Sequence, residues 1–138
     1  MRLRSFFFSV LIMLFGGTAA HGQDAGAGDY RLSLRMVLDG RIIGTPVLIV
    51  RPGEPARVSV DRDGGYSLLI SVAPMSAAPA GRVEVASDVY TRSDGHWTLL
   101  ARPTILMNVG TTASFELSPT AASGRPAFRM EVALAQGP

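Results

Sequence analysis

The chain has 138 residues, a formal net charge of +2 at pH 7, and neither cysteine nor lysine. The lack of cysteine excludes disulfide bonds and the lipid-carrying cysteine of a bacterial lipoprotein, so apolar burial must hold the fold together. The lack of lysine excludes Schiff-base and lysine general-base chemistry.

The first 22 residues are predicted to be a signal peptide. Arg2 and Arg4 precede an apolar run from Phe6 to Phe15, and small residues then lead to Ala20 and Gly22, either of which fits as the last residue before cleavage. The run is about half as long as a bilayer-spanning helix, which disfavours an uncleaved anchor. We therefore expect a periplasmic or secreted protein with no stable membrane insertion after cleavage.

Removal of this segment also changes the charge. The remaining chain has 11 Arg against 11 Asp plus Glu, and its arginines are spread singly along the sequence. A nucleic-acid or anionic-membrane partner would need a net or clustered basic field. We therefore expect no nucleic-acid partner.

After a short leader at residues 23–29, residues 30–138 are predicted to form one all-β domain. Apolar and polar residues alternate strictly, which places one set of side chains in a core and the other in water. No segment has helical spacing, so we expect no substantial helix. The alternating segments are 32–38, 56–60, 66–72, 83–85, 113–117 and 128–134.

Two further segments, Val47–Val50 and Ile105–Met107, are apolar at every position, which predicts strands covered on both faces. Pro46 and Pro103 cannot donate to a β-ladder, so each is expected at a bend that splits a long hairpin arm.

Turn residues separate these segments. Asp39-Gly40 and Asp94-Gly95 are strong hairpin signals because Asp and Gly tolerate positive φ. The small, aperiodic segment 73–81 is predicted to be a linker, and Ser118 to Ala127 a second loop. Further reversals are expected at Pro52-Gly53, Asp63-Gly64-Gly65 and Gly110.

The two sides of the predicted linker resemble each other. Residues 46–60 and 103–117 match at Pro, Gly and Ala, without a gap, at an offset of 57 positions. We expect pseudo-repeats at 30–72 and 82–134, each a four-stranded antiparallel meander. Stacking the two meanders would bury both apolar faces in a β-sandwich. The alternative is two small sheets side by side on a string.

The repeated pattern of Pro, apolar strand, Gly, two residues, Ala and alternating strand resembles a short element of secretin-type outer-membrane channel proteins. It is also similar to periplasmic β-regions of BlaR1-like membrane metallopeptidases. The resemblance covers about 15 residues, twice, at 46–60 and 103–117. It implies a periplasmic interaction module. The chain departs from both families because it has neither long pore-forming strands nor an HExxH motif.

The sequence offers little for catalysis. His96 lies too close in sequence to Ser93 and Asp94 for the three to form a nucleophile, base and orienting acid on one hairpin. The acid pairs Asp61 with Asp63 and Asp88 with Asp94 are predicted to be solvated loop residues rather than a glycosidase pair. We expect no catalytic residue and no enzyme activity.

Ligand-binding residues are also few, and we assign no metal or cofactor site. A copper(I) site could use His96 with Met75, Met107 or Met130, but Met36, Met107 and Met130 occupy apolar strand positions typical of a core. The favoured function is a non-enzymatic module that binds another envelope protein through an exposed strand edge. The alternative is a periplasmic small-ligand or copper carrier, with Tyr90, Trp97 and Met75 lining a pocket. A hydrolase with a rudimentary site is third.

Overall fold

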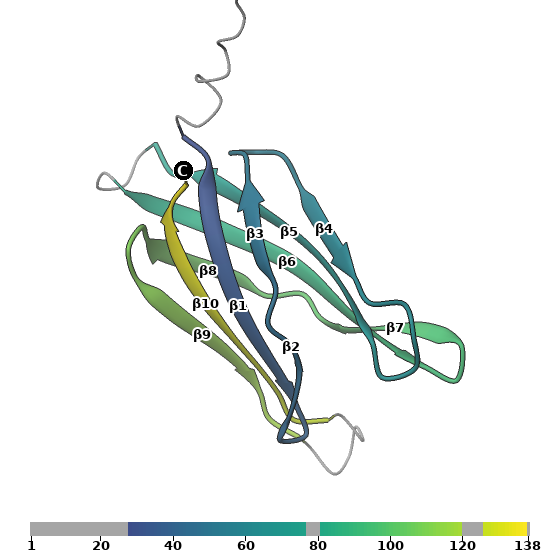
Figure 1. Cartoon of the computed structure of the whole chain (residues 1–138). Helices are drawn as coiled ribbons and strands as arrows, with labels where there is room; N and C mark the ends of the chain where they lie inside the picture. Colours follow the sequence, from purple (N-terminus) through teal and green to yellow (C-terminus); the bar gives the residue numbers. More distant parts are fainter. Residues whose placement is uncertain (1–27, 77–80, 120–125, 138) are drawn as a thin grey trace, which may run out of the picture.

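A computed structural model describes residues 28–76, 81–119 and 126–137. These residues form ten strands in two layers and no helix, as Figure 1 shows. The strands are β1 (Tyr30–Leu38), β2 (Arg41–Gly44), β3 (Val47–Val50), β4 (Ala56–Ser59), β5 (Tyr66–Pro74), β6 (Arg82–Ser93), β7 (His96–Ala101), β8 (Thr104–Asn108), β9 (Thr112–Leu117) and β10 (Phe128–Gln136). The signal-peptide prediction falls outside the described residues.

The strands form two antiparallel sheets of five strands each. Sheet I has the order β2-β1-β10-β9, with β3 also paired to β1. Sheet II has the order β4-β5-β6-β7, with β8 also paired to β6. The prediction of an all-β antiparallel sandwich is therefore confirmed.

The core lies between the sheets and contains the apolar residues of the alternating segments. From Tyr30 to Met36 in β1 and from Phe128 to Leu134 in β10, every second residue is buried, and the residues between are half-buried or exposed. Burial of these side chains supplies the main stabilising term, since the chain has no disulfide. The fully buried side chains include Leu32, Met36, Leu68, Ile70, Val85, Val89, Met130 and Val132.

The expected division into two separate meanders is wrong. Each sheet combines strands from the N-terminal half (β1–β5) and the C-terminal half (β6–β10): β1 pairs with β10 along its length, and β5 pairs with β6. The reason is that the chain leaves its sheet after β3 and again after β8, both edge strands, and continues in the opposite sheet. Neither half therefore forms a complete sheet by itself.

The predicted linker at 73–81 is also different in the structure. β5 continues to Pro74, β6 begins at Arg82, and the amide of Met75 donates to the carbonyl of Arg82 at 3.1 Å. The segment thus connects two hydrogen-bonded neighbours of sheet II, not two separate units.

The two halves nevertheless make equivalent pairings. Leu34 N donates to Pro46 O, and Ser87 N donates to Pro103 O, both at 3.0 Å. A β-bulge follows Met36 in β1, and another follows Val89 in β6. The structure thus gives these residues of one half counterparts in the other. This is the arrangement that a duplication would produce, and the duplication itself stays a prediction.

The predicted bends and hairpin turns are confirmed. Pro46 lies between β2 and β3, which both pair with β1, and Pro103 lies between β7 and β8, which both pair with β6. The turn residues have positive φ: Asp39 is at 49° and Gly40 at 80° in the first hairpin, and Asp94 is at 51° and Gly95 at 79° in the second. Such φ values match the type I′ turns that join strands in two-residue hairpins.

The strands expected to be covered on both faces are covered on one. Val47 is 53% exposed, Ile49 49% and Leu106 48%. The prediction was wrong because the described residues form only two layers, so alternate residues of β3 and β8 point to an outer face that no further layer covers. β3 and β8 therefore have apolar residues on their outer faces as well as on the faces that contribute to the core.

Candidate functional site

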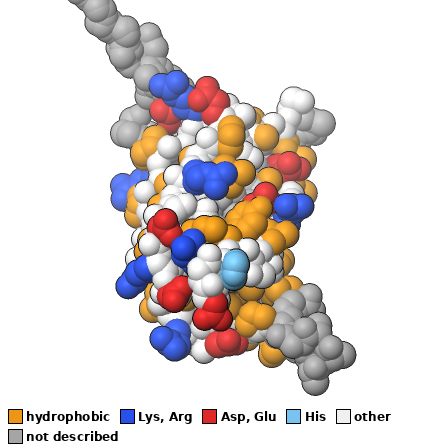
Figure 2. Space-filling model, turned by 90° about the vertical axis from the view of Figure 1, so that its right-hand side faces the viewer, with side chains coloured by type: hydrophobic (Ala, Val, Ile, Leu, Met, Phe, Trp, Pro, Cys, Tyr) orange, Lys and Arg blue, Asp and Glu red, His pale blue; other side chains and the backbone are white. Residues whose placement is uncertain are grey.

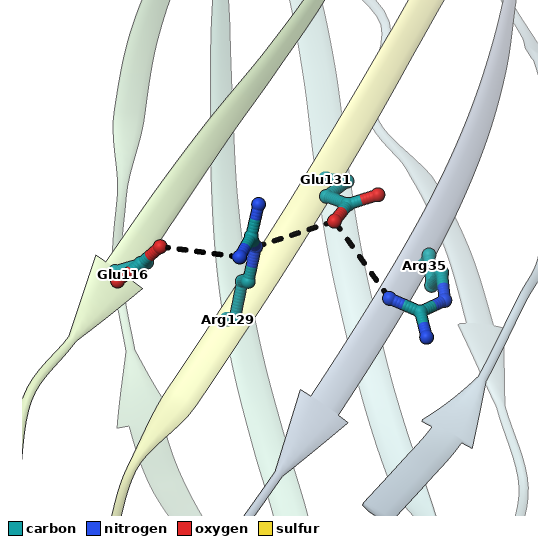
Figure 3. Close-up of polar contacts among 4 residues, drawn as sticks. All are labelled: Arg35, Glu116, Arg129 and Glu131. Atoms are coloured by element: carbon teal, nitrogen blue, oxygen red, sulfur yellow. Dashed lines mark ion pairs between the residues drawn. The ribbon is translucent and has the colours of Figure 1, made fainter. Parts of the chain in front are cut away.

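The outer faces of the two sheets differ in chemistry. On sheet I, a row of alternating charges crosses three strands (Figure 3): Glu116 on β9, Arg129 and Glu131 on β10, and Arg35 on β1. The closest N–O distances are 3.4 Å for Arg129–Glu116, 3.2 Å for Arg129–Glu131 and 3.7 Å for Arg35–Glu131. Partly exposed pairs of this kind add little stability, so their main effect is to keep this face hydrated.

The outer face of sheet II contains a hollow of about 380 Å³, lined by two aromatic side chains. Figure 2 views the molecule from the side on which β4 and β7 lie in Figure 1, and it shows apolar side chains gathered among acidic and basic ones. The residues that line the hollow are Arg57, Ser59, Asp61, Ser67, Tyr90 and Trp97.

Two serines form the floor of the hollow. Ser59 on β4 pairs with Ser67 on β5, and the Ser59 hydroxyl donates to Ser67 Oγ at 2.9 Å. Arg57 Nη1 donates to the same Ser67 Oγ at 3.4 Å, which brings the guanidinium to the floor. Because both floor side chains are short, the larger residues around them rise above the sheet.

The aromatic side is formed by β6 and β7. Tyr90 lies opposite Ser67, and Trp97 lies opposite Arg92 one row further along. The Arg92 guanidinium lies 5.4 Å from the centre of the Trp97 ring, a cation–π distance, and Arg92 Nε lies 3.3 Å from Asp61 Oδ1. These contacts hold the indole beside the hollow.

The charges of the hollow do not balance. Asp61 is paired with Arg92, whereas Arg57 forms no ion pair with any residue that the structure describes. Next to the hollow, Arg102 Nε donates to Asp88 Oδ1 at 3.0 Å. The Asp88 charge, with hydrogen bonds to Tyr90 and Asp88, raises the pKa of Arg102. Arg57 is thus the cation left available to a ligand.

The equivalent position on sheet I shows why the hollow exists. In sheet II the row across the strands is Ser59, Ser67, Tyr90 and Leu99. In sheet I the equivalent row is Glu116, Arg129, Val37 and Ile42. There the ion pair of Arg129 and Glu116 takes the place of the two serines, and the hollow that these residues line with Val37 is smaller, about 180 Å³. The larger volume on sheet II therefore follows from a sequence difference between the halves.

The structure brings two of the three predicted pocket residues together. Tyr90 and Trp97 line the hollow, while Met75 follows the opposite end of β5, beside Arg82. Arg57, Ser59 and Ser67 were not predicted as site residues. Alternation marked them as outward, but only the pairing of β5 with β6 reveals that they face Tyr90.

The other sequence candidates lie apart. His96 is exposed opposite Ser93 at the β6–β7 turn, whereas Met107 and Met130 are buried in the core. Asp63 Oδ1 accepts a hydrogen bond from the Gly95 amide at 3.4 Å.

Asp88, expected on a loop, lies in the middle of β6 and pairs with Arg102. In the described ranges, no three His, Cys, Asp or Glu side chains are grouped closely enough to share a metal ion.

Comparisons with known proteins gave no match to a family model, a curated protein or a solved structure. Within residues 28–76, 81–119 and 126–137, no helix has the length and apolar character needed to cross a membrane.

Proposed function

We propose that the chain is an exported, non-enzymatic β-sandwich module that binds an extended segment of another envelope protein at its apolar strand edges. The observation that carries the proposal is the position of the large exposed apolar side chains: among the described residues, all of them lie on the edge strands β2, β3, β7 and β8. They are Ile42, Val47, Ile49, Trp97, Leu99 and Leu106.

The remaining edge strands are different. The outward residues of β4 are Arg57 and Ser59, and those of β9 include Ser114 and Glu116. Polar and charged residues protect an edge from strand addition, whereas apolar ones favour it. The contrast supports binding at the β2–β3 and β7–β8 edges rather than at β4 or β9.

An extended peptide is the partner that such edges accommodate. Its backbone would hydrogen-bond to the free side of β3 or β8, and its alternate side chains would contact Ile49 or Leu106. The predicted signal peptide supports a partner in the cell envelope. The lack of clustered basic charge agrees with a protein partner.

Site-specific photocrosslinking in the native envelope tests the proposal. A benzoylphenylalanine at Ile49 or Leu106 should give a discrete adduct with a second protein, and the same group at Ser114 on β9 serves as the matched control. Adducts of equal yield from Ser114, adducts with this chain alone, or none from the apolar edges would each overturn it.

Small-ligand binding is a second candidate function, supported by the hollow that contains Tyr90 and Trp97. The separation of His96 from Met107 and Met130 argues for an organic ligand over copper.

A further inference from the structure

We propose that the hollow on the outer face of sheet II binds an acidic sugar, that is, a pyranose ring carrying a carboxylate. The inference rests on the second candidate function and names its ligand class. Trp97 belongs to both surfaces, but the crosslinking positions Ile49 and Leu106 do not line the hollow, so the two proposals can fail independently.

The aromatic side of the hollow suits the apolar face of a sugar ring. Tyr90 and Trp97 both line the hollow, and Trp97 is 39% exposed although Arg92 lies against its ring. Tyrosine and tryptophan provide a rigid apolar surface together with a polar group at its edge. A volume of about 380 Å³ is within the range of small-molecule sites.

The polar side of the hollow suits hydroxyl groups. The Ser59 and Ser67 hydroxyls form the floor, and Asp61 and Tyr90 also line the hollow. Serine and tyrosine hydroxyls both donate and accept, while a carboxylate accepts from a hydroxyl. A polyhydroxylated ring can use the remaining donor and acceptor positions of these groups, whereas a flat aromatic acid cannot, so the ring fits better.

Arg57 supplies the selectivity for a carboxylate. Its guanidinium already reaches the floor through the 3.4 Å contact with Ser67 Oγ, and it forms no ion pair within the described part of the chain. A guanidinium can hold a carboxylate with two parallel hydrogen bonds. Because Asp61 is already neutralised by Arg92, the hollow favours an anion over a neutral sugar.

The hollow at the equivalent position of sheet I is smaller, about 180 Å³, and there the ion pair of Arg129 with Glu116 takes the place of the two serines. This provides a designed control. The double substitution Ser59→Glu with Ser67→Arg copies that pair into sheet II. It should fill the hollow while keeping a residue combination that the same fold accepts.

The test is a titration of the ¹⁵N-labelled processed protein, followed by NMR. Sodium glucuronate is the probe, glucose supplies the ring without the carboxylate, and acetate supplies the carboxylate without the ring. Glucuronate should shift the indole N–H signal of Trp97 and the amides around Ser67. Its affinity should exceed those of glucose and acetate by about tenfold, the contribution of one charge-assisted contact.

The variants separate binding from folding. Arg57→Gln should weaken glucuronate binding about tenfold, whereas Arg129→Gln, on the other sheet, should leave it unchanged. The filled variant S59E/S67R should give a folded spectrum with no shift at Trp97. The proposal is overturned by an unmoved Trp97 signal with glucuronate, by equal binding of glucose, or by binding that survives in the folded S59E/S67R protein.

Discussion

Ser87 allows a sharp test of how the core is built. It lies on β6 between Val85 and Val89 on the inward side, is 5% exposed, and its hydroxyl has no hydrogen-bond partner among the described residues. Its counterpart in the N-terminal half is Leu34, which is also buried. A buried hydroxyl without a partner costs about 1–3 kcal/mol of desolvation. We predict that Ser87→Ala stabilises the protein.

The size of the effect follows from this geometry. Ser87→Ala removes the unpaired group and keeps the Cβ, so it creates almost no cavity. Taking the lower end of the desolvation range, we expect a gain of about 1 kcal/mol in the free energy of unfolding. For a domain of roughly 100 residues this raises Tm by about 4 °C.

Ser67 is the matched control. It is equally buried, at 6% exposure, but its Oγ accepts hydrogen bonds from Ser59 and Arg57. The same change to alanine should therefore destabilise by about 0.5–1.5 kcal/mol, the usual net value of a hydrogen bond.

Urea unfolding of both variants, followed by circular dichroism, measures the two free energies with a common slope. The reasoning is refuted if Ser87→Ala loses stability, because its hydroxyl must then be satisfied in the folded state. It is equally refuted if the two variants shift in the same direction.

Three further predictions concern the core, one close backbone approach and the pH dependence. Met130→Ala removes a fully buried side chain of β10 and should cost about 2–5 kcal/mol in the free energy of urea unfolding; a cost below about 1 kcal/mol would mean that the site is not packed. Gly44→Ala places a Cβ against the Tyr66 ring and should destabilise the protein by about 1–3 kcal/mol. The counterpart of Gly44 in the C-terminal half, Ala101, already carries a Cβ. Unchanged stability would contradict the close approach of Gly44 to the ring. Burial raises the pKa of Tyr66 above its ordinary value of 10.0. The stability that the protonated phenol gives the folded state is therefore fully present below pH 10 and is lost as the pH rises through the raised pKa. Tyr66→Phe should reduce the loss of Tm above pH 10, and an unaltered alkaline profile would exclude this residue as a cause.

The strands and turns could be predicted because their signals are local. Alternation identified β1, β5 and β10 nearly to the residue, and the Asp-Gly pairs identified both two-residue hairpins. Even the bends at Pro46 and Pro103 followed from the missing amide hydrogen.

The pairing of strands could not be predicted in the same way. Nothing local distinguishes a chain that continues in its sheet after β3 from one that crosses to the opposite sheet. The assignment to separate meanders therefore left out the pairing of β5 with β6, and with it the position of Ser67 opposite Tyr90. The apolar pattern of β3 and β8 was misinterpreted for a related reason, because the pattern of one strand does not show how many layers cover it.

The hollow depends on this pairing, since Arg57, Ser59 and Ser67 come from the N-terminal half and Tyr90 and Trp97 from the C-terminal half. Because the protein has no cysteine, engineered disulfides can test the pairing without interference.

Two pairs join the halves on the outer faces: Ser33 with Ala133 in sheet I, and Ser71 with Ala86 in sheet II. Residues directly opposite on antiparallel strands have Cα atoms about 4.5–5.5 Å apart, within disulfide reach. The account predicts that S33C/A133C and S71C/A86C both oxidise to an intramolecular disulfide in the folded protein. The control S33C/A86C, with its cysteines on opposite outer faces, should stay reduced. Failure of both pairs to close, or closure of the control, would contradict the interleaved sheets on which the site depends.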